Sequence, residues 1–246
     1  MKIAIYSREV KKENISFVKE MFLVLEKHNI EIIVCKTFSD FLKNEIANSS
    51  YSIFSTNKEL KGVDYLFSIG GDGTLLETIT LIRDANIPVL GINTGRLGYL
   101  SAITIDKVNE AVTNLIQGDF ELDSRTLLSL KTKNDFFGET NYALNEVTVQ
   151  KKDTSSMITI HVYLNSEFLN SYWADGLIFS TPTGSTAYSL SCNGPIVLPD
   201  SGNIIITPIA PHNLNVRPLV ISDETKIKLK IEGRTDNFLT ALDSRS

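Results

Sequence analysis

The chain has 246 residues, of which 24 are basic and 29 acidic, so its net charge is −5, and 42% are hydrophobic. This length allows one large domain or two modest ones, and either can bury a core without a metal or disulfide staple. The acidic balance argues against a nucleic-acid partner or a membrane-surface role, and no apolar run approaches the ~20 residues of a transmembrane helix.

The first half of the chain alternates short apolar runs with segments of helical period. Apolar residues recurring every three or four positions predict helices around residues 15–25, 76–83 and 108–117. Strands alternating with helices are typical of a parallel sheet, so we expect an α/β Rossmann-like domain over residues 1–110. The predicted strands are Lys2–Tyr6, Glu31–Cys35, Tyr65–Ile69 and Pro88–Ile92.

The helical period fades after Asp119. Six of the seven prolines lie between Pro182 and Pro218, where they would interrupt long helices. We therefore expect a mostly β, sandwich-like C-terminal domain over residues 111–246, with a soft boundary within residues 101–123. The predicted strands are Leu127–Thr132, Asn145–Gln150, Ile158–Leu164, Leu177–Ser180, Ile204–Thr207 and the strictly alternating Lys226–Ile231.

A glycine-rich loop, Gly70-Gly71-Asp72-Gly73, follows a predicted strand and opens a predicted helix. Ligands gather at such strand ends, and a helix N-terminus behind glycines favours phosphate. An aspartate there repels anions, so Asp72 makes sense as a proton acceptor from a hydroxyl or as a metal ligand. The alternative is a tight turn in which Asp72 only caps the helix.

Two further segments could bind a nucleotide. The loop Asp175–Ser191 is rich in hydroxyl groups and lacks the spaced Gly-Lys of a P-loop; its alternative is a helix-capping Ser/Thr turn. Asn145-Glu146 places an amide beside a carboxylate, a pair that can bind a base edge and a ribose diol, or that can be merely solvated. His212 and Trp173 could serve a site, but structural roles are at least as plausible.

Taken together, these segments resemble the NAD kinase family, which phosphorylates the adenosine 2′-hydroxyl of NAD. The resemblance runs from the Gly70 loop to about Val220 and includes Gly91–Leu100, Asn145-Glu146-Val147 and Asp175–Ser191. It also includes Ile206–His212 and Arg217-Pro218-Leu219. The Gly-Gly-Asp-Gly loop alone is shared with phosphofructokinases and with diacylglycerol and sphingoid kinases, whereas the long loop after Asn145-Glu146 is far more specific.

The resemblance implies that Asp72 is the general base for the 2′-hydroxyl. The family's Ala-Gly-Gly-Pro turn is Cys192-Asn193-Gly194-Pro195 here, which puts the shape of that turn in doubt. Asp243 falls where the family has a further site-lining segment. The residues implied in NAD binding are Asp72, Gly73, Asn145, Glu146, Asp175, Thr183, Thr186, Ala187, Tyr188, Ser189, Leu190, Ser191 and Ala210.

The expected substrates are NAD and ATP, with Mg²⁺ or Mn²⁺ arriving on the nucleotide, because no carboxylate cluster forms a metal cage. The family also implies a homodimer or homotetramer. Two widely separated cysteines, Cys35 and Cys192, favour a cytoplasmic setting. The alternatives are a lipid or sphingoid kinase, which the charge and Asn145-Glu146 disfavour, and a non-catalytic dinucleotide-binding regulator, which has no use for Asp72. Family members run on beyond Ser246, so we expect the natural chain to be longer.

Overall fold

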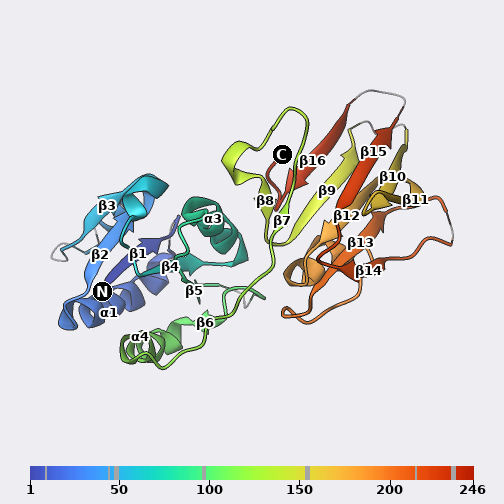
Figure 1. Cartoon of the computed structure of the whole chain (residues 1–246). Coiled ribbons are helices and arrows are strands. Elements are labelled where there is room, and N and C mark those ends of the chain that lie inside the picture. Colours follow the sequence, from blue (N-terminus) through green and yellow to red (C-terminus); the bar gives the residue numbers. More distant parts are fainter. Residues whose placement is uncertain are drawn as a thin grey trace. The chain divides into compact units, whose positions relative to one another are not determined.

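The computed structural model describes residues 1–8, 10–43, 45–46, 50–95, 98–152, 156–213, 215–233 and 237–246. The chain divides into two compact units, Met1–Leu122 and Asp123–Ser246 (Figure 1). The division falls after Leu122, not at residue 110, because the helix Val108–Gln117 packs against the first helix of unit 1.

Unit 1 is built on a six-stranded, all-parallel sheet in the order β3-β2-β1-β4-β5-β6, which confirms the expected Rossmann-like arrangement. The order reverses between β1 and β4, and ligands of such sheets bind outside the carboxyl ends at that point. The strands are β1 Lys2–Tyr6, β2 Glu31–Cys35, β3 Ser52–Phe54, β4 Tyr65–Gly70, β5 Val89–Asn93 and β6 Ile103–Thr104. The α-helices are α1 Ile15–Lys27, α2 Lys36–Leu42, α3 Asp72–Ile82 and α4 Val108–Gln117, and short 3₁₀ turns cover Lys12–Asn14, Asn57–Leu60 and Ile105–Lys107.

The core of unit 1 holds the glycine-rich loop in place. Leu66, Phe67 and Ile69 of β4 are fully buried, as expected for a central parallel strand covered on both faces. Burying each such side chain contributes about 1.5–3 kcal/mol. The strand is therefore fixed up to Gly70, and the loop that follows starts from a rigid base.

Unit 2 is antiparallel and contains two sheets that share one core. A five-stranded sheet has the order β14-β13-β12-β9-β16, and a three-stranded sheet has the order β11-β10-β15. Val147 and Phe179 of the first sheet and Ile160 and Val162 of the second belong to the same buried cluster, which confirms the sandwich-like expectation. The strands are β7 Leu128–Ser129, β8 Tyr142–Ala143, β9 Glu146–Lys151, β10 Ile158–Leu164, β11 Glu167–Ala174, β12 Gly176–Ser180, β13 Asn203–Ile209, β14 Leu219–Ser222, β15 Ile227–Glu232 and β16 Phe238–Leu242. The helix α5 covers Tyr188–Ser191, and 3₁₀ turns cover Gly138–Thr140 and Thr183–Thr186.

One predicted strand of unit 2 is much shorter than expected. Only Leu128–Ser129 of the segment 127–132 forms a strand, because its partner β8 offers two residues for pairing. In contrast, β15 alternates half-buried and exposed side chains along its whole length, as its sequence predicts. Within the described residues, no helix combines the length and apolar character needed to cross a membrane.

Candidate functional site

The glycine-rich loop joins β4 to α3 at the point where the strand order of unit 1 reverses. Asp72 is the first residue of α3, and Gly71 occupies the N-cap position without a side-chain capping bond. The interpretation of Asp72 as a simple helix cap is therefore wrong, because its carboxylate is bound elsewhere. Gly73 follows and is exposed.

The carboxylate of Asp72 is held by the loop that follows β5. Its Oδ2 accepts the Tyr99 N–H at 2.9 Å, and its Oδ1 accepts the N–H groups of Leu100 and Ser101 at 3.1 and 3.2 Å. An ionised carboxylate offers about four acceptor sites. The described residues occupy three of them, and the fourth, on Oδ2, can accept a hydroxyl proton. Two residues of the Gly91–Leu100 motif, Arg96 and Leu97, lie outside the described residues.

The close approach of this loop depends on glycine at position 98. A Cβ added to Gly98 would lie 2.2 Å from Oδ1 of Asp72, well inside van der Waals contact. A Cβ added to Gly95, in the same loop, would meet no atom of the described residues within 4 Å. The two glycines therefore differ in function: only Gly98 permits the contact that fixes Asp72.

In unit 2, Asn145 and Glu146 lie where β9 begins, and Glu146 is paired across the sheet with Ser180. The side chain of Glu146 is only 7% exposed, and within the described residues its Oε2 has no hydrogen-bond partner. Burial, and then the nearby charge of Asp243, raise the pKa of Glu146 to about 7, against the opposing effect of the Tyr188 N–H. Glu146 thus accepts the Tyr188 N–H, while its Oε2 is a buried acceptor without a donor among the described residues.

The loop after β12 packs directly on the Asn145 backbone. The Thr181 N–H donates to the Asn145 carbonyl at 2.9 Å, and the Thr181 hydroxyl donates to the Leu144 carbonyl at 2.5 Å. A Cβ on Gly184 would lie 2.0 Å from the Asn145 carbonyl oxygen. The absence of a side chain at position 184 therefore lets the 3₁₀ turn Thr183–Thr186 rest against the segment that carries Glu146.

The expected NAD-binding residues of this loop divide into two groups. Ser189 is buried with its hydroxyl 2.8 Å from that of Thr207, and the Thr183 hydroxyl accepts a bond from Arg125 at 3.4 Å, so both are engaged within unit 2. The remaining members are available at the surface. Thr186 and Ala187 are partly exposed, and Tyr188, Leu190 and Ser191 are exposed.

Tyr188 links the Glu146 end of this surface to the opposite end of β12. Its N–H faces Glu146, while its hydroxyl lies 3.5 Å from the Gln150 amide nitrogen. At that opposite end the Asp175 carboxylate pairs with Lys151 at 2.7 Å, and the Asp175 N–H bonds to the carbonyl preceding Ala210 at 3.0 Å. The five residues of β12 separate the two ends by about 15 Å, which suits an elongated ligand.

The turn after α5 accommodates the sequence departure noted above. Asn193 has a φ of +65°, in the left-handed region where glycine and asparagine are favoured. The Gly194 N–H then returns to the Ser189 carbonyl at 2.8 Å. Asparagine at position 193 therefore suits the left-handed conformation that this turn requires.

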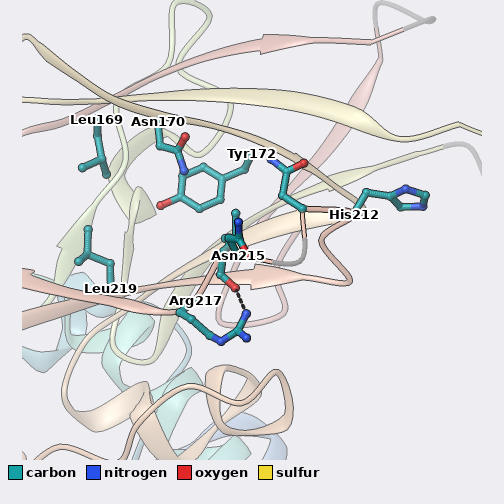
Figure 2. Close-up of a pocket in the computed structure, with 9 residues that line it drawn as sticks. Leu169, Asn170, Tyr172, His212, Asn215, Arg217 and Leu219 are labelled. Atoms are coloured by element: carbon teal, nitrogen blue, oxygen red, sulfur yellow. Dashed lines mark hydrogen bonds between the residues drawn. The ribbon is translucent and has the colours of Figure 1, made fainter.

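A separate hollow of about 730 Å³ lies on unit 2, and none of the expected site residues lines it (Figure 2). His212 is at its edge and is exposed, with its ring 4.7 Å from that of Trp173. Trp173 is itself 49% exposed, so of the two roles considered for it, packing in the core is excluded. The lining residues are Leu169, Asn170, Tyr172, His212, Asn213, Asn215, Val216, Arg217 and Leu219.

The described residues contain no group of three or more His, Cys, Asp or Glu side chains that could enclose a metal ion. Any metal at this surface would need most of its ligands from a bound nucleotide or from water. That donor set fits Mg²⁺, which keeps several waters and binds few protein carboxylates.

The chain was compared with known proteins. The family profiles described as ATP-NAD kinase N-terminal domain and ATP-NAD kinase C-terminal domain match residues 3–120 and 144–246. The NAD kinases of Cytophaga hutchinsonii and Flavobacterium psychrophilum are 49% and 48% identical, over all of this chain and 85% of theirs. The structure of yeast NADH kinase complexed with NADH superposes with a TM-score of 0.88 at 25% identity, covering 100% of this chain and 75% of that one. An Archaeoglobus fulgidus NAD kinase in complex with ATP shares the fold, with a TM-score of 0.78 at 24% identity over 100% of this chain and 85% of its own.

Proposed function

The chain belongs to the NAD kinase family, and we propose that Asp72 is the general base of its reaction, the phosphorylation of NAD to NADP by ATP. The observation that supports this assignment is the acceptor site on Asp72 Oδ2 that no described residue occupies, at the strand end where ligands of such sheets bind. The 2′-hydroxyl of NAD is a poor nucleophile at neutral pH. A positioned carboxylate that takes its proton contributes ~10²–10⁴-fold to the rate.

The loop after β5 supplies the positioning that such a base needs. Three backbone N–H groups fix both carboxylate oxygens, so Asp72 cannot rotate away from the hydroxyl it serves. The proton moves to Oδ2 as the 2′-oxygen attacks the terminal phosphorus of ATP and ADP leaves. The rest of the catalysis is orientation and charge neutralisation.

We assign NAD binding to the surface around Glu146 and Tyr188. The unpartnered Oε2 of Glu146 is an acceptor for sugar hydroxyls or for an exocyclic amino group of the base. Asp175 and Ala210, at the far end of β12, are placed to contact the other half of the dinucleotide. The full proposed set also includes Gly73, Asn145, Thr183, Thr186, Ala187, Ser189, Leu190 and Ser191.

A divalent cation, Mg²⁺ or Mn²⁺, would neutralise the phosphates of ATP when it is bound with the nucleotide. The chain offers no enclosing cluster of ligands within its described part, so we assign the majority of the coordination to phosphate and water. We also propose a homodimer or homotetramer, on the basis of the family, and a cytoplasmic location, with which the free thiols of Cys35 and Cys192 agree.

The test is the variant Asp72→Asn, which keeps the size of the side chain, cannot accept the proton, and turns an NH₂ group toward at least one of the three N–H donors. We expect NADP formation from NAD, ATP and Mg²⁺ to fall at least 10²-fold in kcat, while calorimetry shows NAD binding within a few-fold of wild type. The exposed Asp84, just beyond α3, provides the matched control Asp84→Asn, which should keep full activity. An Asp72→Asn variant with more than about a tenth of the wild-type kcat would exclude Asp72 as the base.

A further inference from the structure

Strand β16 ends in a tight turn that reaches back to the NAD-binding surface proposed above. Leu242 and Arg245 exchange backbone hydrogen bonds of 2.8 and 2.9 Å. The two residues between them, Asp243 and Ser244, have φ values of +47° and +68°, as in a type I′ turn. Aspartate tolerates this left-handed conformation better than most residues, so the turn holds Asp243 in one orientation.

The Asp243 carboxylate binds the backbone of three consecutive residues. Its oxygens accept the N–H groups of Leu144 at 2.7 Å, Asn145 at 2.7 Å and Glu146 at 3.1 Å. The Asp243 N–H in turn donates to the Glu146 carbonyl at 3.1 Å. With its side chain only 4% exposed, Asp243 has little surface to offer a ligand. Asp243 therefore binds the backbone of residues 144–146 and leaves contact with a ligand to that segment.

Arg245 fixes the residues just before this segment, Thr140 and Tyr142, in the same way. Its guanidinium donates to the carbonyl groups of Thr140 at 2.9 Å, Leu242 at 3.1 Å and Tyr142. It also lies 4.0 Å from the Asp243 carboxylate and offsets part of its charge. The chain entering β9 is thus fixed from the turn after β16, almost a hundred residues later in the sequence.

We propose that Asp243 is a positioning residue for NAD binding: it fixes the backbone of residues 144–146 so that the Asn145 amide and the Glu146 carboxyl are set before NAD arrives. This inference builds on the proposed function only in naming NAD as the ligand. Preorganisation of this kind acts on affinity, because the ordering cost is met in the free protein.

The nearby charges give Asp243 a second effect that a purely structural residue would lack. The titratable and charged groups around Glu146 are Asp243 from the turn and Tyr188 from α5, with Arg245 behind Asp243. The negative charge of Asp243 raises the pKa of Glu146 after burial does. Removing that charge should therefore move the pH dependence of NAD affinity to lower pH.

The test is Asp243→Asn, because asparagine accepts a positive φ but turns an NH₂ group toward backbone donors. We expect hydrogen exchange at residues 144–146 to quicken at least 10-fold, and the Kd and KM for NAD to rise at least 10-fold. The kcat at saturating NAD should change less than about 3-fold, and the midpoint of the pH dependence of Kd should fall. The control Ser244→Asn alters the exposed neighbour in the same turn and should match wild type in all four measurements.

Two results would overturn the proposal. One is rapid exchange at residues 144–146 in the wild-type protein, a measurement that needs neither a variant nor turnover. The other is an Asp243→Asn protein that binds NAD within twofold of wild type with an unmoved midpoint. The exchange measurement tests the hydrogen bonds between Asp243 and residues 144–146, whatever the role of Asp72. Either proposal can therefore be refuted without refuting the other.

Discussion

The geometry of the loop after β5 predicts that a methyl group added at Gly98 impairs the proposed base by displacing Asp72, although Asp72 itself is unchanged. In Gly98→Ala the new Cβ would lie 2.2 Å from Asp72 Oδ1, whereas ordinary contact begins at 3.4 Å. The carboxylate or the loop must therefore retreat by about 1.2 Å, which strains or breaks the three N–H bonds to Asp72. A misplacement of ~1 Å at a reacting group can cost ~10²-fold in rate. We expect kcat to fall by about that factor.

The assay is NADP formation from NAD, ATP and Mg²⁺, followed with an NADP-specific dehydrogenase. The KM for NAD should change far less than kcat, because the residues around Glu146 belong to unit 2 and are not altered. Gly95→Ala is the matched control, since the same substitution in the same loop meets nothing within 4 Å. If Gly98→Ala keeps more than a third of the wild-type kcat, or Gly95→Ala loses as much, the loop does not position Asp72.

Two further substitutions test unit 2. Gly184→Ala would place a Cβ 2.0 Å from the Asn145 carbonyl oxygen, so the backbone must move. We expect thermal melts to show about 1–3 kcal/mol of destabilisation, and initial rates to show a ~10-fold higher KM for NAD. Glu146→Gln should weaken NAD binding ~10–100-fold by calorimetry, because an acceptor of charge-assisted hydrogen bonds becomes neutral. The same variant should be more stable than wild type at pH 8 by about 3 kcal/mol. The reason is that the pKa of Glu146 is about 7 in the folded protein, so wild type loses stability as pH rises from ~4.5 to 7. Equal denaturant midpoints of the two proteins at pH 8 would contradict this.

Local patterns in the sequence were enough to predict the parallel sheet and the loop that carries Asp72. Strands such as Tyr65–Gly70 are buried on both faces, so they appear as nearly continuous apolar runs, here interrupted only by Ser68 and ending in glycine. The strands without that signal were missed. Four of the eight residues of β11 are exposed, and β14 is an edge strand with three exposed residues of four, so neither shows a regular alternation along its whole length.

The helix Lys36–Leu42 was missed for a different reason. It follows β2 with no intervening loop, and Cys35 at its N-cap makes no side-chain capping bond. The usual start signal of a helix, a Ser, Thr, Asp or Asn at the cap, is therefore absent from the sequence. Its buried residues Phe38 and Leu42 pack because the tertiary fold offers them a core, which outweighs the weak local preference.

The site could be predicted as a set of residues but not as a mechanism of positioning, because both decisive carboxylates act through contacts distant in sequence. Asp72 accepts N–H groups of residues 99–101, and Asp243 accepts those of residues 144–146. The arrangement is the same, a carboxylate facing three consecutive backbone donors, but the roles are reversed. In unit 1 a loop positions the proposed base, Asp72. In unit 2 a side chain, Asp243, positions the segment 144–146 that is proposed to bind NAD.

Among the carboxyl groups of Asp72, Asp243 and Glu146, that of Glu146 is the one whose burial destabilises the free protein. Each aspartate is stabilised by three donors, whereas Glu146 is buried beside Asp243 with one oxygen that has no partner among the described residues. A buried acceptor without a donor destabilises the free protein, and a ligand that supplies the donor recovers that cost on binding. The hydrogen bonds to Asp243 fix the backbone from which the Glu146 side chain extends. Under the NAD-binding role proposed for Glu146, part of the affinity comes from the instability of this carboxyl group, which is why its removal should stabilise the fold and weaken the binding together.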